Sequence, residues 1–110
     1  MIPFDITDPS TFMNLRILEV LRGVIDPELG INIIDMGLVY AVRTDEPAKR
    51  ILVDMTLSSP YCPMGDSILK AVGNSLEQAF EGYQALVTLV WEPAWSYDRI
   101  SEEGKKMLGA

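Results

Sequence analysis

Residues 50–80 of the chain read RILVDMTLSSPYCPMGDSILKAVGNSLEQAF. Apolar side chains occupy every second position from 51 to 57, which is typical of a β-strand with one buried face. Over 63–80 the apolar residues recur three and four positions apart, which predicts a helix that buries one face. Pro63 suits the first position of such a helix. A strand followed by a helix predicts a right-handed crossover to a further, parallel strand.

The segments on both sides of this stretch complete a small fold. Periodicity and turn residues predict a helix over 12–22, a turn over 26–30, strands over 38–44 and 84–91, a hairpin loop over 45–49 and a helix over 101–108. The third strand is mostly apolar, so we expect it to be buried and Trp91 to lie in the core. This order predicts an α+β fold of two layers. The hairpin and the third strand form a small mixed sheet, and helices pack on one of its faces.

The composition fits a single globular domain over residues 1–110. Apolar residues make up 48% and charged residues 23% of the chain, and the formal net charge is −7. A nucleic-acid binder needs a basic surface to neutralise phosphates, so this charge argues against nucleic acid as a partner. It argues equally against an anionic membrane surface. We expect neither a secretory signal nor a membrane span, because no cationic segment precedes an apolar run of sufficient length.

The chain has one cysteine, Cys62, and no histidine. One cysteine makes no internal disulfide, so we expect a reduced, cytoplasmic setting. Cys62 precedes the expected helix, whose unpaired N–H groups favour a thiolate that could act as nucleophile or metal ligand. Asp66 in the first helical turn opposes this ionisation. A free cysteine is also often only a small buried side chain, so the residues alone leave these alternatives open.

Oxygen-bearing side chains supply further candidates. Asp26 and Glu28 lie on one tight turn and could bind a hard metal ion or assist proton transfer. The alternative is that an aspartate before proline only begins a turn. Thr56, Ser58 and Ser59 follow the second strand. Their hydroxyl groups could donate to a bound anion or a thiolate, or they could satisfy nearby backbone groups.

Aromatic side chains gather in the loop over 92–97, which follows the third strand. Trp95 and Tyr97 are candidates for a surface that binds a partner, because aromatic residues combine an apolar body with a polar end. Asp35, which precedes a Met-Gly pair, is expected to be an ordinary turn residue.

Four motifs resemble the metal–sulfur cluster biosynthetic family, which includes SufT-like and PaaD-like bacterial proteins and the MIP18-type component of a eukaryotic assembly machinery. In chain order the motifs cover residues 26–30, 34–40, 55–63 and 90–95, and the match runs over about 12–110. The resemblance implies an α+β iron–sulfur assembly domain. It implies that the chain matures iron–sulfur proteins as a carrier or an adaptor, not as an enzyme.

The resemblance also implies a site. Cys62 matches the signature cysteine, and Asp26, Glu28 and Thr56 match positions expected to gather around it. Tyr61 stands where the family often has glycine and would narrow access to the thiol. Because a cluster normally takes four thiolate-type ligands, we expect no stably bound cofactor. A transient iron–sulfur cluster or iron would be shared with another chain, which is a second copy in a homodimer, the assembly machinery or a client apo-protein.

The residues also suggest two other functions, a cysteine-dependent enzyme and a structural or protein-interaction module. A cysteine-dependent enzyme is disfavoured, because a chain without histidine has no Cys–His or Ser–His pair and carboxylates are weak bases. In a structural or protein-interaction module, Cys62 would be inert and the aromatic loop would bind the partner.

Overall fold

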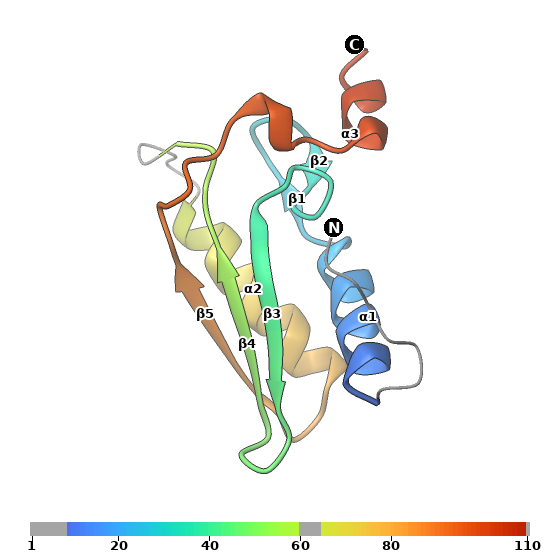
Figure 1. Ribbon diagram of the computed structural model, residues 1–110, viewed down its shortest axis with the longest axis vertical. Helices are drawn as coiled ribbons and strands as arrows, with labels where there is room; N and C mark the ends of the chain where they lie inside the picture. The colour runs from blue at the N-terminus through green and yellow to red at the C-terminus, as the bar shows by residue number, and fades with distance from the viewer. Residues whose placement is uncertain (1–8, 60–64, 110) are drawn as a thin grey trace.

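The structure is a computed structural model that describes residues 9–59 and 65–109. Its elements are, in chain order, α1 (Pro9–Leu21), β1 (Ile25–Asp26), β2 (Ile31–Asn32), β3 (Val39–Asp45), β4 (Arg50–Met55), α2 (Gly65–Ala79), β5 (Gln84–Leu89), the 3-10 helix η1 (Tyr97–Arg99) and α3 (Glu102–Met107). Figure 1 shows the arrangement of these elements. None of the helices within the described ranges is long and apolar enough to cross a membrane.

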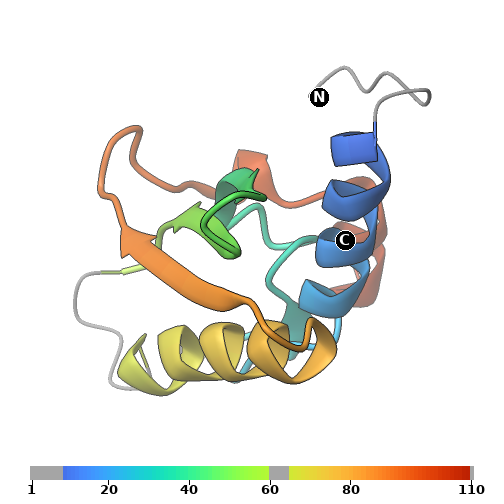
Figure 2. The same ribbon diagram turned by 90° about the horizontal axis from the view of Figure 1, so that it is seen from below.

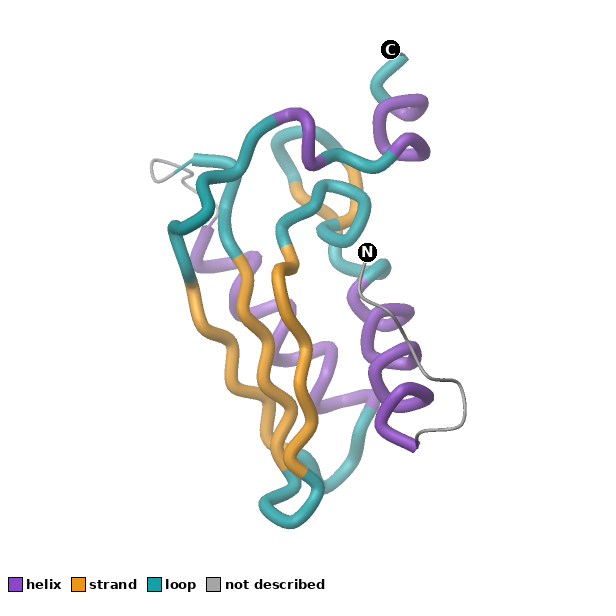
Figure 3. The backbone as a smooth tube through the Cα atoms, viewed as in Figure 1, coloured by secondary structure: helices purple, strands orange, loops and turns teal. Residues whose placement is uncertain are grey.

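The main sheet has three strands in the order β3-β4-β5. β3 and β4 form an antiparallel hairpin, and β5 pairs with β4 in parallel after the crossover through α2. Figure 3 shows the three strands side by side, with loops at both ends. The predicted mixed sheet is therefore confirmed. A second sheet, in which the two-residue strands β1 and β2 pair antiparallel around the turn over 27–30, was not predicted.

The two long helices form the second layer. Figure 2 shows α2 lying along the sheet and α1 beside it. The side chains of Ile51, Val53 and Met55 on β4 are fully buried in the core. On α2 the buried positions are Gly65, Ile68, Val72 and Leu76. The predicted two-layer α+β architecture is thus confirmed, and the alternation along β4 turns its apolar side chains toward the core.

Local expectations differ from the structure at the first helix and at the third strand. The first helix begins at Pro9 rather than at residue 12, since proline is well suited to a first helical turn. β5 lies at the edge of the sheet and is half-buried rather than buried; it ends at Leu89, and Trp91 is 43% exposed instead of lying in the core. Trp91 is exposed because the chain leaves the sheet before it. The expected helix start at Pro63 lies outside the described residues.

The C-terminal segment is fastened to the loop over 35–37. The indole N–H of Trp95 donates a hydrogen bond to the carbonyl of Met36 at 2.6 Å. The backbone N–H and the hydroxyl of Ser101 both donate to Asp35, to its carbonyl and its Oδ1, at 2.8 Å each. Ser101 also caps α3 by accepting from the N–H of Gly104 at 3.0 Å. The helix predicted over 101–108 is confirmed as α3.

Asp35 is more than the ordinary turn residue expected from the sequence. Its Oδ2 accepts a hydrogen bond from the side chain of Asn32 at 2.7 Å, and its Oδ1 lies 3.4 Å from a guanidinium nitrogen of Arg22. Burial raises the pKa of Asp35, but the hydrogen bonds from Asn32 and Ser101, together with the charge of Arg22, outweigh burial and hold that pKa below its ordinary value. The carboxylate of Asp35 therefore stabilises the folded state.

Gly37 has a φ of 75°, and a methyl group at this position would overlap the carbonyl oxygen of Arg99. Gly30 has a similar φ of 71°, but its surroundings are open. We therefore predict that Gly37→Ala lowers the free energy of unfolding by about 1–3 kcal/mol more than Gly30→Ala does. Denaturant unfolding of both variants measures this difference. Equal losses would show that the C-terminal segment does not press on Gly37.

Replacing Asp35 tests its role as a charged acceptor. At neutral pH, Asp35→Asn should lower the free energy of unfolding by about 2 kcal/mol, because charge-assisted hydrogen bonds are lost. A carboxyl group with a lowered pKa stabilises the fold above its ordinary pKa and loses this effect as the pH falls through its folded pKa. The difference from wild type should therefore be constant above about pH 5 and shrink below about pH 4.

Asp98, which is exposed, serves as the control. Asp98→Asn should change the free energy of unfolding little at any pH. A difference between wild type and Asp35→Asn that stayed the same down to pH 2 would contradict the assigned role of the carboxylate.

Candidate functional site

β4 ends and α2 begins at the same end of the sheet (Figure 1), and Cys62 lies between these elements in the sequence. Leu57, just past β4, is buried and packs against Gly65, the first residue of α2. A Cβ atom built on Gly65 would lie 2.7 Å from Cδ1 of Leu57. The exit of β4 and the start of α2 are therefore in close contact. Cys62 itself lies outside the described residues, and its predicted role stays a prediction.

The turn over 26–30 is held by Asp26, which is almost fully buried. Its carboxylate accepts the backbone N–H of Glu28 at 2.8 Å, and its carbonyl accepts the N–H of Gly30 at 2.8 Å. An aspartate that bonds the N–H two residues onward forms an Asx turn. The carboxylate of Asp26 thus fixes the turn, whereas the side chain of Glu28 is exposed.

This turn meets the exit of β4. The hydroxyl of Ser58 donates to Oε2 of Glu28 at 3.4 Å, although the two residues are 30 positions apart in the sequence. Thr56 is buried, and its hydroxyl lies 3.5 Å from the carbonyl of Leu57. The N–H of Thr56 donates to the carbonyl of Leu38 at 2.8 Å. Ser58 therefore faces the turn, while Thr56 makes local backbone contacts.

Ser59 is half-buried beside Ser58, at the last described position before the cysteine. The predicted set of oxygen-bearing side chains thus divides in two. Glu28 and Ser58 are in contact just before the chain reaches residue 60, and Asp26 holds the turn that carries Glu28. Among the residues that the structure describes, no three potential metal ligands of the His, Cys, Asp or Glu type gather in one group.

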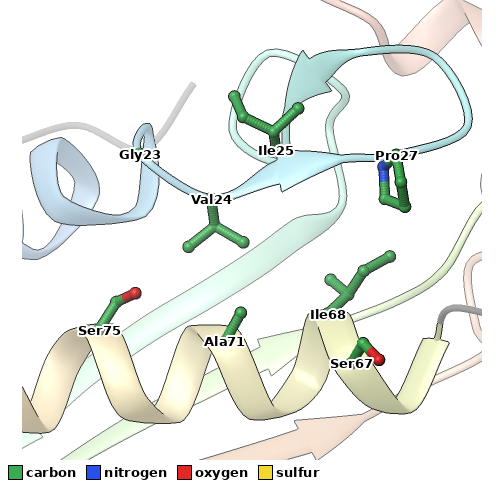
Figure 4. Close-up of a pocket in the computed structure, with 8 residues that line it drawn as sticks. All are labelled: Gly23, Val24, Ile25, Pro27, Ser67, Ile68, Ala71 and Ser75. Atoms are coloured by element: carbon green, nitrogen blue, oxygen red, sulfur yellow. The ribbon is translucent and has the colours of Figure 1, made fainter.

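A groove of about 390 Å³ adjoins the turn (Figure 4). It lies between α2 and the segment that enters the turn, and it is lined by Gly23, Val24, Ile25, Pro27, Ser67, Ile68, Ala71 and Ser75. Val24 points toward the helix, and Ile68 and Ala71 point back toward it. Pro27 lies across the groove from Ile68, near the beginning of α2. No motif marked this groove in the sequence; the small and apolar residues at helical spacing on α2 were the available signal.

The start of α2 adds an electrostatic feature. The first N–H groups of a helix of this length carry partial positive charge. Asp66 lies in the first turn and is exposed, and the turn that carries Glu28 lies nearby. Carboxylates and helix N-terminus therefore act in opposite directions on any anion bound at this end of α2.

The aromatic candidates occupy different environments. Trp95 is half-buried against the core and anchors the C-terminal segment through Met36. Tyr97 is 59% exposed, and its ring centroid lies 5.6 Å from that of Trp95. That Trp95 and Tyr97 bind a partner stays a prediction, and Tyr97 is the more accessible of the two.

Sequence relatives identify the kind of protein to which this site belongs. Residues 15–87 match the model of a family described as iron–sulfur cluster assembly protein. The chain is 45% identical over 86 residues to the Fe-S protein maturation auxiliary factor SufT of Staphylococcus aureus, and this alignment covers 78% of the chain and 97% of that protein. It is 39% identical over 94 residues to the Fe-S protein maturation auxiliary factor YitW of Bacillus subtilis, with 86% and 91% covered.

Solved structures agree with these relatives. The fold is similar to that of a domain of unknown function, DUF59, from Bacillus anthracis, with a TM-score of 0.85, 36% identity and coverage of 91% of this chain and 94% of that one. A Mycobacterium tuberculosis protein associated with Fe-S complex assembly and repair, Rv1466, gives a TM-score of 0.51 at 35% identity, with 96% and 92% covered. On this sequence and structural evidence, the chain belongs to the iron–sulfur cluster assembly protein family.

Proposed function

We propose that this chain is an auxiliary factor in the maturation of iron–sulfur proteins and that it handles iron or a cluster transiently through Cys62. The relatives from Staphylococcus aureus and Bacillus subtilis bear the name of maturation auxiliary factors rather than of enzymes. Family membership and these names support the maturation role.

The contact between Ser58 and Glu28 is the observation that best supports the position of the site. It joins two sequence motifs at the point where the chain enters the segment that contains Cys62. Glu28 is exposed there, so its carboxylate is accessible to a bound ion. A carboxylate oxygen suits iron in its harder, oxygen-ligated form, and a thiolate suits both iron and clusters.

Each described residue then has a distinct task. Asp26 holds the turn through the N–H of Glu28 and is not itself exposed. Glu28 offers an oxygen ligand, which the hydroxyl of Ser58 orients by donating to it. The N-terminus of α2 favours the anionic form of a thiol placed before it, and Asp66 reduces that effect.

The number of sulfur and nitrogen ligands in the chain limits how it would hold iron or a cluster. The chain has one cysteine and no histidine, whereas a cluster normally takes four thiolate-type ligands. The remaining ligands must come from a second copy, from the assembly machinery or from the client apo-protein. Sharing of this kind favours release, because every ligand that the client supplies replaces one supplied by the carrier. The cytoplasmic location expected for such a factor stays a prediction.

Cellular complementation tests this proposal. In cells that lack the chromosomal gene, Cys62→Ser should fail to restore the activity of an iron–sulfur client enzyme. Glu28→Gln should restore it in part, because the amide keeps the size of the side chain and loses the charge. Glu81, exposed and outside the site, provides the matched control: Glu81→Gln should restore full activity. Immunoblots check that the four proteins accumulate equally.

Full client activity with Cys62→Ser at normal protein level would overturn the thiol-based role. The chain would then act as an adaptor in which Cys62 is inert. Loss of activity with Glu81→Gln as well would show that general destabilisation, not the site, governs the result.

A further inference from the structure

The two edge strands of the main sheet, β3 and β5, differ in how well they are blocked from pairing with a further strand. The β3 edge carries a register shift between Val39 and Ala41 and charged side chains at Arg43 and Asp45, and α1 packs on β3. Bulges, charges and covering elements are the usual means of blocking an edge strand. β5 (QALVTL) forms the other edge and has no charged residue, no proline and no register shift. The β5 edge is therefore open to a further strand.

The backbone groups of β5 alternate between those that bond to β4 and those that face away from the sheet. The N–H of Gln84 donates to the carbonyl of Lys49, and the N–H of Val90 donates to that of Met55. Successive residues of a strand point their backbone groups to opposite sides, so the groups of Ala85, Val87 and Leu89 face away from β4. Within residues 9–59 and 65–109, no backbone partner is found for the N–H groups of these three residues.

One of these three donors is nevertheless occupied. Oε2 of Glu77, on the last turn of α2, accepts the N–H of Ala85 at 3.0 Å. This carboxylate closes the first part of the β5 edge. It leaves the backbone groups of Val87 and Leu89 exposed to a partner in the second part, toward the carboxyl end of the strand.

We propose that the carboxyl-terminal half of β5 binds an extended segment of a partner protein as a fourth strand. Strand addition draws affinity from main-chain hydrogen bonds and specificity from alternate side chains. The segment should be mainly apolar. It should carry no acidic residue where it passes Glu77, whose carboxylate would repel it.

A partner fits this edge better than a second copy does. A two-fold β5–β5 pair that used the whole strand would meet the carboxylate of Glu77 twice, once from each copy. Each copy also carries a formal net charge of −7, so two copies repel one another. A segment that pairs only with Val87 and Leu89 avoids the carboxylate.

The proposed surface adjoins the candidate site. Leu89 pairs with Met55 at the end of β4, two residues before Leu57 and three before Ser58. A strand added here would bring the partner's backbone to the end of the sheet where the segment with Cys62 begins (Figure 1). Trp91, 43% exposed just beyond β5, offers an aromatic surface for the same partner. That the partner is an iron–sulfur client or assembly protein rests on the proposed function. Whether a strand is added to β5 is measured by peptide binding, independently of client activity.

Two proline variants of the full-length chain separate this proposal from a general effect on the fold. Val87→Pro removes an exposed N–H, and Ala85→Pro removes the N–H that Glu77 already occupies. Neither change removes a hydrogen bond to β4. Ala85→Pro also gives up the hydrogen bond to Glu77, so it costs the fold at least as much as Val87→Pro does and controls for destabilisation. The probe is an array of short overlapping peptides from the iron–sulfur and assembly proteins of the same cell. Amide hydrogen exchange of the labelled chain is then measured with the tightest peptide.

The peptide should protect the amides of Val87 and Leu89. Val87→Pro should weaken its binding about tenfold or more, and Ala85→Pro by less than about twofold, because one main-chain hydrogen bond is lost only in the first. If Val87→Pro unfolds, Glu77→Ala still tests the proposal. This variant frees the N–H of Ala85, so the bound peptide should then protect the Ala85 amide from exchange as well.

Three results would overturn the proposal: no peptide binds, the bound peptide protects amides elsewhere, or Val87→Pro binds as tightly as Ala85→Pro. Protection of Val87 that rises with the concentration of the chain alone, together with a doubled mass, would assign the edge to a second copy instead. Intact peptide binding with full client activity for Cys62→Ser would overturn the proposed function and leave strand addition standing.

Discussion

The parallel pairing of β4 with β5 fixes where the chain must cross the sheet and so where the candidate site lies. Parallel neighbours need a crossover, and α2 supplies it across the core face of the sheet. The chain must therefore leave β4 and enter α2 at the same end of the sheet. The packing of Leu57 against Gly65 keeps that passage tight. The segment that contains Cys62 begins and ends there, beside the exposed edge of β5.

Two smaller devices complete this end of the molecule. Asp26 fixes the turn that presents Glu28 to Ser58, and Asp35 ties the C-terminal segment to the loop after β2. The carboxylate of Asp26 accepts a backbone N–H, and that of Asp35 accepts side-chain donors, so both charges serve the structure. Glu28 differs because its carboxylate is exposed. Asp26 and Asp35 thus hold the backbone in place, whereas Glu28 keeps an exposed carboxylate where the proposed site lies.

Local patterns predicted most of the fold and part of the site. The alternation in β4 and the helical spacing in α2 were readable because each element buries one face. The two-stranded sheet of β1 and β2 was missed, since two residues are too few for periodicity. The hydrogen bond between Asp35 and Ser101 joins residues 66 positions apart, and the contact of Glu77 with Ala85 depends on how α2 lies against β5. Such contacts arise from tertiary packing and leave no local pattern.

If Cys62 holds cargo that another chain helps to bind, anaerobic loading and transfer of a cluster will require this cysteine. The purified chain is incubated with ferric iron and sulfide, and absorption and native mass are measured before and after an apo-client is added. We expect a cluster chromophore that requires Cys62, resides on more than one chain and moves to the client. A chromophore of equal intensity with Cys62→Ser, or one held by a single chain and retained in the presence of the client, would contradict it.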